Sequence, residues 1–405
     1  MNACGISENA RIPLWTEEFA ADPHRFYASM RRDHGSLVPV ELAPGVPATL
    51  VVDYHVALRI LHDPVHFPAD PSLWEAGVAS ECPILPMMRA RPNAIRTTGE
   101  VHTRYRAAVS DALGRIDHYR LSVIVEDAAK AAIDTFRADV SCDVLSQFAF
   151  PVTLGTLNAL LGCSPDISSR AAAGIAAVFD IDDGATEGNR VLEDALYDLV
   201  ALKRSTPSDD VTSWLTQHPA ALSDEEIMHQ LVLLYAAGMS PPLNLIGNTL
   251  LLMLTDSRFG GGVLAGSLAL RDALDEVLYD DPPLANYCLT YPPRPVFIEG
   301  VWLPENQPVM ISMAGCNTDP LIRTADSGLP GNRAHLAFGA GPHACPARSI
   351  GYLIAQIAID LLLDALPDME LAVAGSQLRW QPGPFHRALS ALPVNLRGSG
   401  PNSTP

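Results

Sequence analysis

The hydrophobic positions along the chain recur mostly at the spacing of α-helices. This spacing predicts helices over residues 120–136, 189–203 and 351–366, the last ended by Pro367. Ser223, followed by three acidic residues, predicts the capped start of a long helix that reaches Leu254. Alternating residues predict a small sheet over residues 37–53 and short strands within residues 296–311 and 371–396. The pattern therefore predicts a mainly α fold with a small β region.

The remaining segments indicate one large domain. Residues 64–98 are rich in proline, and we expect a long loop there with one short helix; such loops are commonly functional. No break in composition divides the chain. We expect an N-terminal arm over residues 1–14, a single domain over residues 15–397 and a disordered tail over residues 398–405.

One apolar stretch is long enough to cross a bilayer. Residues 231–254 contain no charged side chain. However, Gly238, Ser240, Pro241 and Asn244 interrupt the stretch, and its flanks are acidic without a Lys/Arg bias. We interpret it as a buried helix in a large core.

Charge and cysteine content exclude several classes of protein. The 405 residues include 27 Lys and Arg against 46 Asp and Glu, a formal net charge of -19, which argues against binding to nucleic acid or anionic membranes. The seven cysteines are scattered and form no CxxC pair, as is typical of a reducing compartment. Residues 1–13 lack the layout of a signal peptide. We expect a cytoplasmic monomer.

A glycine-rich segment leads to Cys345. Residues 335–348 read HLAFGAGPHACPAR, directly before the apolar helix. Glycines allow the backbone to approach a large flat ligand, and the helix N-terminus stabilises a thiolate. An iron bound by such a thiolate receives electron density that favours O–O cleavage. The alternative is an inert buried cysteine on a glycine turn.

The complete pattern Phe338-Gly339-x-Gly341-x-His343-x-Cys345 resembles the haem-binding loop of cytochromes P450. Ala347 stands where that family usually has glycine, and Pro346 follows the cysteine. The resemblance runs from about residue 15 to residue 396. It implies the cytochrome P450 fold and a haem b (iron protoporphyrin IX) whose iron Cys345 ligates. The haem-binding residues then include Phe338, Gly339, His343, Cys345 and Gly351.

Cationic side chains are expected at the haem propionates. His102 and Arg106 are four residues apart and share one helix face. Such a pair is commonly only a solvated face, but here it resembles the family's His-x-x-x-Arg propionate clamp. The resemblance gives His343 the same role, and we add Arg294, because Thr290 sits where many members place another propionate arginine.

The long helix departs from the family at its centre. Residues 237–242 read AGMSPP, where the family has a glycine followed by an acid and an alcohol that relay protons. The resemblance places Ala237 and Gly238 against the haem, with Ser240 at the acid position and Pro241 at the alcohol position. Pro241 has neither a side-chain donor nor an N–H. We expect Ser240 and Asn244, one turn apart, to hold a water instead.

A second departure concerns the family's Glu-x-x-Arg motif. It reads Glu276-Val-Leu-Tyr279 here, which resembles a set of actinobacterial members that tolerate its loss. A buried glutamate without its arginine needs another cation or a raised pKa. Arg294 and Arg333 are the candidates.

The resemblance also implies a substrate pocket and electron donors. We expect Met87, Met88, Leu234 and Phe385 to line the pocket; core packing is an equal alternative for the two methionines. Electrons are expected from a ferredoxin and its reductase, which dock near Cys345. Arg348 and Arg104 are candidate contacts, although an exposed arginine is usually only solvated.

The sequence thus predicts a haem-thiolate oxidoreductase that acts with dioxygen on a small organic substrate of secondary metabolism. Pro241 favours oxidative coupling or a substrate-assisted mechanism over ordinary hydroxylation. The alternative is a haem protein that binds a ligand or partner without turnover. A peroxide-driven enzyme needs an arginine or carboxylate near the iron, and residues 237–242 contain neither.

Overall fold

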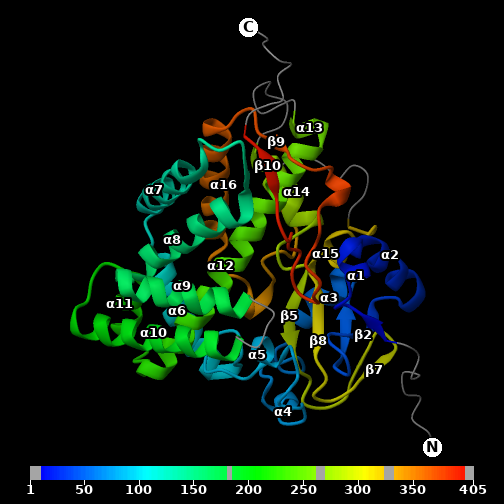
Figure 1. Cartoon of the computed structure of the whole chain (residues 1–405). Coiled ribbons are helices and arrows are strands. Elements are labelled where there is room, and N and C mark those ends of the chain that lie inside the picture. Colours follow the sequence, from blue (N-terminus) through cyan, green and yellow to red (C-terminus); the bar gives the residue numbers. More distant parts are fainter. Residues whose placement is uncertain (1–10, 180–184, 261–269, 323–332, 397–405) are drawn as a thin grey trace, which may run out of the picture.

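The computed structural model describes residues 11–179, 185–260, 270–322 and 333–396 (Figure 1). Helices dominate, as the hydrophobic pattern predicts. The helices are α1 Glu17–Ala21, α2 Pro23–His34, α3 Tyr54–Leu61, α4 Ser72–Glu75, α5 Leu85–Met88, α6 Gly99–Gly114, α7 His118–Phe136, α8 Phe150–Leu161, α9 Pro165–Phe179, α10 Ala185–Ser205, α11 Val211–Thr216, α12 Asp224–Thr255, α13 Ser257–Gly260, α14 Leu270–Asp280, α15 Met313–Asn317 and α16 Arg348–Ala365. A π-helical turn, Leu145–Ala149, precedes α8, and short 3₁₀ turns lie at Gly341–His343 and Gly375–Gln377.

The strands form three small sheets. A five-stranded sheet has the order β1-β2-β3-β8-β5, a three-stranded sheet the order β4-β10-β9, and β6 and β7 form a hairpin. The strands are β1 Ile12–Pro13, β2 Leu37–Glu41, β3 Pro47–Val51, β4 Ser141–Asp143, β5 Asn286–Thr290, β6 Val296–Ile298, β7 Val301–Leu303, β8 Val309–Ser312, β9 Glu370–Leu371 and β10 Pro393–Asn395. The strands lie in two places, β2, β5, β7 and β8 at the lower right of Figure 1 and β9 and β10 near its top. Because β1 pairs with β2, the sheet begins before residue 15, where the sequence suggested that the domain starts.

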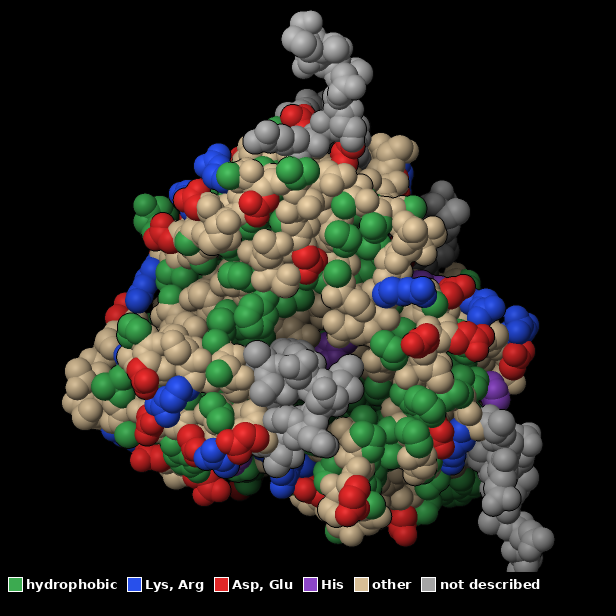
Figure 2. Space-filling view, in the orientation of Figure 1, with side chains coloured by type: hydrophobic (Ala, Val, Ile, Leu, Met, Phe, Trp, Pro, Cys, Tyr) green, Lys and Arg blue, Asp and Glu red, His purple; other side chains and the backbone are tan. Residues whose placement is uncertain are grey.

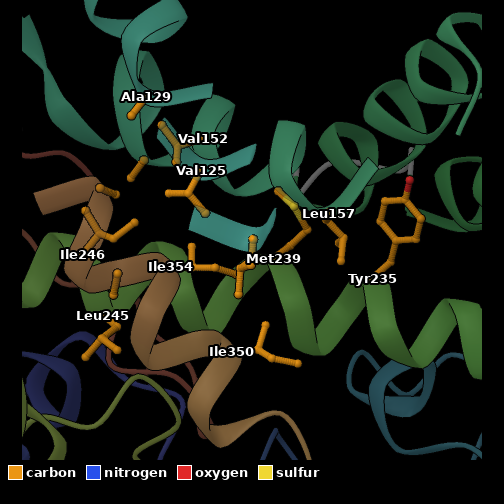
Figure 3. Packing of buried hydrophobic residues seen from close by; sticks show 14 of the residues in the cluster. Val125, Ala129, Val152, Leu157, Tyr235, Met239, Leu245, Ile246, Ile350 and Ile354 are labelled. Carbon is orange, nitrogen blue, oxygen red and sulfur yellow. The ribbon is translucent and has the colours of Figure 1, made fainter. Parts of the chain in front are cut away.

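The long central helix α12 is the axis of the helical core. Ser223 and Glu226 form a complete capping box at its start, and the helix continues through Pro241 and Pro242. Apolar side chains of α7, α8, α12 and α16 interdigitate around it (Figure 3). The uncharged stretch over residues 231–254 therefore belongs to a largely buried helix, as expected. Within the described residues, no helix is both long and apolar enough to cross a membrane.

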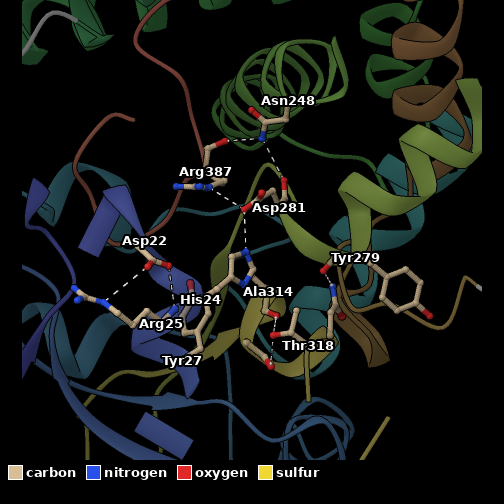
Figure 4. A network of polar contacts seen from close by, with 12 residues as sticks. Asp22, His24, Arg25, Tyr27, Asn248, Tyr279, Asp281, Ala314, Thr318 and Arg387 are labelled. Atoms are coloured by element: carbon tan, nitrogen blue, oxygen red, sulfur yellow. Dashed lines mark hydrogen bonds and ion pairs between the residues drawn. The ribbon is translucent and has the colours of Figure 1, made fainter. Parts of the chain in front are cut away.

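A polar network joins distant parts of the chain (Figure 4). The Asp281 carboxylate accepts hydrogen bonds from Nε2 of His24, at 3.2 Å, and from Nε of Arg387, at 2.9 Å. The amide of Asn248, on α12, donates to the carbonyl oxygens of Asp281 and Arg387. Burial raises the pKa of Asp281, and the contacts with His24 and Arg387 lower it, with a net shift downward. The network thus holds α2, α12 and the C-terminal segment against one another.

The loop over residues 64–98 contains two short helices, α4 and α5, where the sequence predicted one. Its end is fixed to α12: Gln230 accepts from the N–H of Ala94 and donates to the carbonyl of Pro92.

On the face shown in Figure 2, acidic and basic side chains are interspersed. The predicted tail, residues 398–405, lies outside the described residues.

The start of α12 is tied to α6 by an ion pair. Arg104 donates to both carboxylate oxygens of Glu226, at 2.7 and 2.8 Å, and Tyr105 donates to the same carboxylate. These donors and the N–H of Ser223 lower the pKa of Glu226 to about 2. Arg104, a candidate contact for a redox partner, is thus engaged inside the protein.

Replacing Glu226 by glutamine should lower the free energy of unfolding by about 2 kcal/mol at pH 7. Glutamine still completes the capping box, so the loss reports the pair with Arg104. Because the folded pKa is depressed, the stabilisation is present above the pKa of an unfolded glutamate and disappears as the pH falls from about 5 towards 2. Urea unfolding at several pH values measures it. Glu225→Gln, one residue away and exposed, is the control and should change little; equal effects of the two variants would contradict the assignment.

Candidate active site

The glycine-rich segment forms a compact loop that ends at Cys345. The N–H of Cys345 donates to the carbonyl oxygen of Phe338, at 2.8 Å, and closes the loop. Arg348, the first residue of α16, lies with its guanidinium carbon 5.3 Å from the centroid of the Phe338 ring. The cysteine therefore stands just before the N-terminus of α16, where backbone N–H groups favour an anionic sulfur.

The electrostatic surroundings of Cys345 act in opposite directions. Its side chain is accessible to water, yet enough protein surrounds the sulfur for burial to raise the pKa of the thiol. The backbone of Ala347 and the guanidinium groups of Arg106 and Arg348 act to lower that pKa. A bound metal ion removes the thiol proton outright, and these three groups then stabilise the thiolate.

Two glycines determine the path of the loop. Gly339 and Gly341 have φ values of +65° and +69°, a backbone region that other residues rarely adopt. A Cβ atom on Gly341 would lie 2.1 Å from the carbonyl oxygen of Leu61 at the end of α3. The position therefore accepts only glycine, because both its backbone angle and its contact with α3 exclude a side chain.

His102, Arg106 and His343 meet beside the loop. The rings of His102 and His343 lie 4.1 Å apart between centroids, and Arg106 donates to the carbonyl oxygen of Ala344 at 2.5 Å. Burial and Arg106 lower the pKa of His102; burial, His102 and the nearby arginines lower the pKa of His343 to about 4. Nε2 of His102 and Nδ1 of His343 are buried without a hydrogen-bond partner. These surroundings favour the neutral form of both imidazoles, and each ring retains a polar atom for a ligand.

The central helix presents an open face near its middle. Ala237 is exposed, and Leu234, Gly238, Ser240 and Pro241 are partly exposed, although most of α12 is buried. The amide of Asn244 donates to Oγ of Ser240 at 3.2 Å. The two side chains thus bond each other directly, where the sequence suggested that they hold a water.

Gly238 has a packing role. A Cβ atom there would lie 2.9 Å from Cδ1 of Leu157 on α8. Its small size therefore lets α12 approach α8; its place against the haem stays a prediction from the resemblance.

The proposed pocket residues are not all on one surface. Met87 is exposed and Leu234 partly so. Met88 and Phe385 are buried in the apolar cluster around the five-stranded sheet. The structure thus places Met88 in core packing, the alternative reading of that residue.

Arg294 is not part of the propionate cluster. It is exposed in the turn before β6 and, within the described residues, forms no hydrogen bond or ion pair. The turn carries it away from β5, the strand that holds Thr290. Arg294 makes no contact with Glu276, and its exposed position gives no support to the expected role at a propionate.

Tyr279 stands where the family's Glu-x-x-Arg motif has its arginine, and two other arginines pair with the acidic residues of this helix. Glu276 accepts from Arg258 at 2.6 Å, and Arg333 donates instead to Asp275, at 2.9 Å. Asp275 is buried, so the Arg333 pair is the one that braces the interior. The ring of Tyr279 packs edge-on against His335 at 5.3 Å. Our expectation that Arg294 or Arg333 pairs with Glu276 is thus wrong.

The chain is similar to known proteins over almost its whole length. No protein-family model matches the chain. It is 28% identical to 2-hydroxy-5-methyl-1-naphthoate 7-hydroxylase of Streptomyces carzinostaticus, over 95% of this chain and 98% of that protein. It is also 28% identical to cytochrome P450 monooxygenase PikC of Streptomyces venezuelae, over 94% and 92%. The solved structure of CYP154C4 from Streptomyces sp. W2061 superposes with a TM-score of 0.86 at 26% identity, covering 96% of this chain and 98% of that one. The chain thus has the cytochrome P450 fold, and its listed relatives are bacterial proteins, PikC among them a cytochrome P450 monooxygenase.

The residues of this chain fit the haem that the likeness to cytochromes P450 implies. The unpartnered atoms of His102 and His343 are buried beside Arg106, and no carboxylate of the described residues pairs with any of the three. A cluster of donors without an anion suits a ligand that carries carboxylates. Cys345, at a helix N-terminus, suits an iron ion. The residues present thus fit a haem with a thiolate ligand.

The sequence analysis did not identify one residue near this cluster, Arg96. Arg96, in the loop before α6, is 5% exposed and contributes to the lowered pKa of His343. It belongs to no motif that we identified, and the irregular loop around it offers no periodicity. A buried arginine close to two unpartnered histidines becomes visible only in three dimensions.

Replacing Gly341 by alanine should remove most of the haem from the purified protein. The added methyl group meets the Leu61 carbonyl, and the left-handed backbone adds a strain of about 1 kcal/mol. Gly45→Ala is the control, because Gly45 has a φ of +76° but nothing within 4 Å of its Cβ position. The ratio of Soret to protein absorbance measures haem content. Equal ratios in the two variants would show that contact with α3 does not position the loop.

Proposed function

We propose that this cytochrome P450 is a haem-thiolate monooxygenase that oxidises a small organic substrate of secondary metabolism. The observation that carries the proposal is that the Cys345 loop, the donors of the His102 cluster and the open face of α12 belong to one cytochrome P450 fold. Among the relatives, PikC is named a monooxygenase and others are named hydroxylases of a naphthoate and of 6-deoxyerythronolide B. We assign the chain to the actinobacterial members with a degenerate Glu-x-x-Arg motif, supported by Glu276 and Tyr279.

The residues of the chain divide the work of holding the cofactor. Cys345 provides the iron ligand, and the guanidinium groups of Arg106 and Arg348 lower the pKa of its thiol. His102, Arg106 and His343 hold the propionates. When bound, a haem with a thiolate ligand supplies the chemistry of dioxygen activation. The protein orients the cofactor and places the α12 face against it.

Proton supply is where this chain differs from its family. Asn244 donates to Oγ of Ser240, which leaves the Ser240 hydroxyl hydrogen able to donate elsewhere. Pro241 and Pro242 have no N–H, so the carbonyl groups of Ala237 and Gly238 lack their helical donors. The face thus offers one hydroxyl donor and two backbone acceptors, a set that positions a substrate hydroxyl or a water. This arrangement supports substrate-assisted hydroxylation or oxidative coupling.

Electrons come from outside the chain, in our proposal from a ferredoxin and its reductase. A concave surface beside Cys345 is lined by Arg271, Arg333 and Arg348 together with His118. The three arginines contrast with the net charge of -19 of the whole chain and suit an acidic carrier. The six described cysteines are all free, which supports a reducing compartment such as the cytoplasm.

The thiolate assignment is tested by the carbon monoxide difference spectrum of the reduced protein. We expect the thiolate-type Soret band in the native protein and its loss in Cys345→Ala. Cys288→Ala is the matched control, because Cys288 lies beside Gly339 of the same loop, and it should keep the band. A native protein that lacks haem, or a band that survives in Cys345→Ala, would overturn the proposal.

Restoring threonine at position 241 tests the substrate-assisted mechanism. If the substrate supplies the hydroxyl, Pro241→Thr should change product formation by less than about twofold, well below the 10²–10⁴-fold typical of a proton-transfer catalyst. Turnover is measured with a surrogate ferredoxin and reductase, on a ligand selected by binding spectra from aromatic peptides, polyketides and steroids. A large gain in Pro241→Thr would contradict the mechanism. Steady product formation by the native protein would exclude a haem protein that only binds a ligand.

A further inference from the structure

Arg96 is a buried cation without an anionic partner. It is 5% exposed, and Nη2 donates to the carbonyl oxygen of Met87 and, at 2.9 Å, to the hydroxyl of Tyr287. Its guanidinium carbon lies 5.6 Å from the centroid of the Tyr287 ring. Within the described residues it pairs with no carboxylate. Burying a charge without a counter-charge is costly, so a partner is expected when the protein is in its working form.

The surroundings of Arg96 are those of the propionate cluster. The ring of His343 lies 4.1 Å from that of His102, and Arg106, one helical turn after His102, donates to the carbonyl oxygen of Ala344. Arg96 and the backbone of Ala94 lie close enough to His343 to interact with it. Two guanidinium groups and two imidazoles thus share one region. Among the described residues no carboxylate pairs with them, so a bound anion would balance the positive charge of the two guanidinium groups.

The loop holds Arg96 in place before any ligand binds. The side-chain oxygen of Asn93 accepts from the N–H groups of Ile95 and Arg96, at 3.2 and 3.1 Å. Gln230, fully buried on α12, holds the backbone on either side of Asn93. A preorganised donor loses little entropy on binding, which favours affinity.

The guanidinium group retains donors for a ligand. Both of its hydrogen bonds use Nη2, so the N–H groups of Nε and Nη1 remain without an acceptor in the described residues. These neighbouring donors match the two oxygens of a carboxylate. Arg96 also contacts β5 through Tyr287, three residues before Thr290, where many members of the family carry a propionate arginine.

We infer that Arg96 binds a haem propionate and takes the place of the arginine that Thr290 replaces. The inference rests on the proposed haem site and concerns the part that this loop plays in it. A purely structural alternative exists, in which Arg96 only ties the loop to Tyr287. The experiment therefore needs a measurement that responds to the propionate itself.

The test compares holoprotein variants in two measurements. The first is the rate of haem transfer to excess apomyoglobin, and the second is the propionate bending band in the resonance Raman spectrum. In Arg96→Gln we expect haem loss about tenfold faster, the factor that corresponds to 1.4 kcal/mol, and a shifted propionate band. Arg294→Gln removes the same charge from an exposed site and should leave both unchanged. Tyr287→Phe removes one structural partner of Arg96 and should leave the band in place.

Each result distinguishes a propionate-binding role of Arg96 from a purely structural one. An unshifted band in Arg96→Gln, or the same effects in Tyr287→Phe, shows a structural role and overturns the inference. If Arg96→Gln does not fold, Arg96→Lys replaces it: lysine lacks the paired donors, so the band must still shift, and an unshifted band again overturns the inference. A native protein without haem would instead overturn the proposed function, and the two failures are therefore distinguishable.

Discussion

The rest of this structure depends on holding one sulfur atom at a fixed place without enclosing it. Cys345 stands at the N-terminus of α16, on a loop that closes through its own N–H and the carbonyl of Phe338. Gly341 presses the loop against the end of α3 so closely that a side chain has no room. The packing of α16 on α7 and α12 then transmits this position to the core. A loop with few apolar contacts is thus made precise by the rigid elements on both sides of it.

The charges around His102 and His343 also suit the site to an anionic ligand. The chain carries many more acids than bases, yet around His102 and His343 the charged groups are Arg96 and Arg106. Concentrating cations in one buried region costs free energy in the isolated protein. The same cost becomes a source of affinity once an anionic ligand enters, because the site has no internal carboxylate that must first be displaced.

The sequence analysis succeeded where a pattern is local and failed where orientation decides. The capping box at Ser223 and the apolar run behind it determine α12 directly, and the motif around Cys345 identifies its loop. Asp275 and Glu276 are neighbours in sequence but point about 100° apart around α14, so the pattern did not show which carboxylate faces inward. Arg294 lies near Thr290 in the chain, but a turn directs it to solvent. Arg96 was missed because an isolated arginine in an irregular loop leaves no periodic signal.

The network around Asp281 has a consequence for how the chain is made. Arg387, close to the C-terminus, donates to Asp281 and to the carbonyl oxygen of Ala20 at the end of α1. β3, near the start of the chain, has β8 as a sheet partner, which is synthesised some 260 residues later. On the ribosome, the N-terminal strands therefore emerge long before their partners exist. Their apolar faces and unpaired edges stay open until those partners have been made, which exposes the newly made chain to aggregation during that interval.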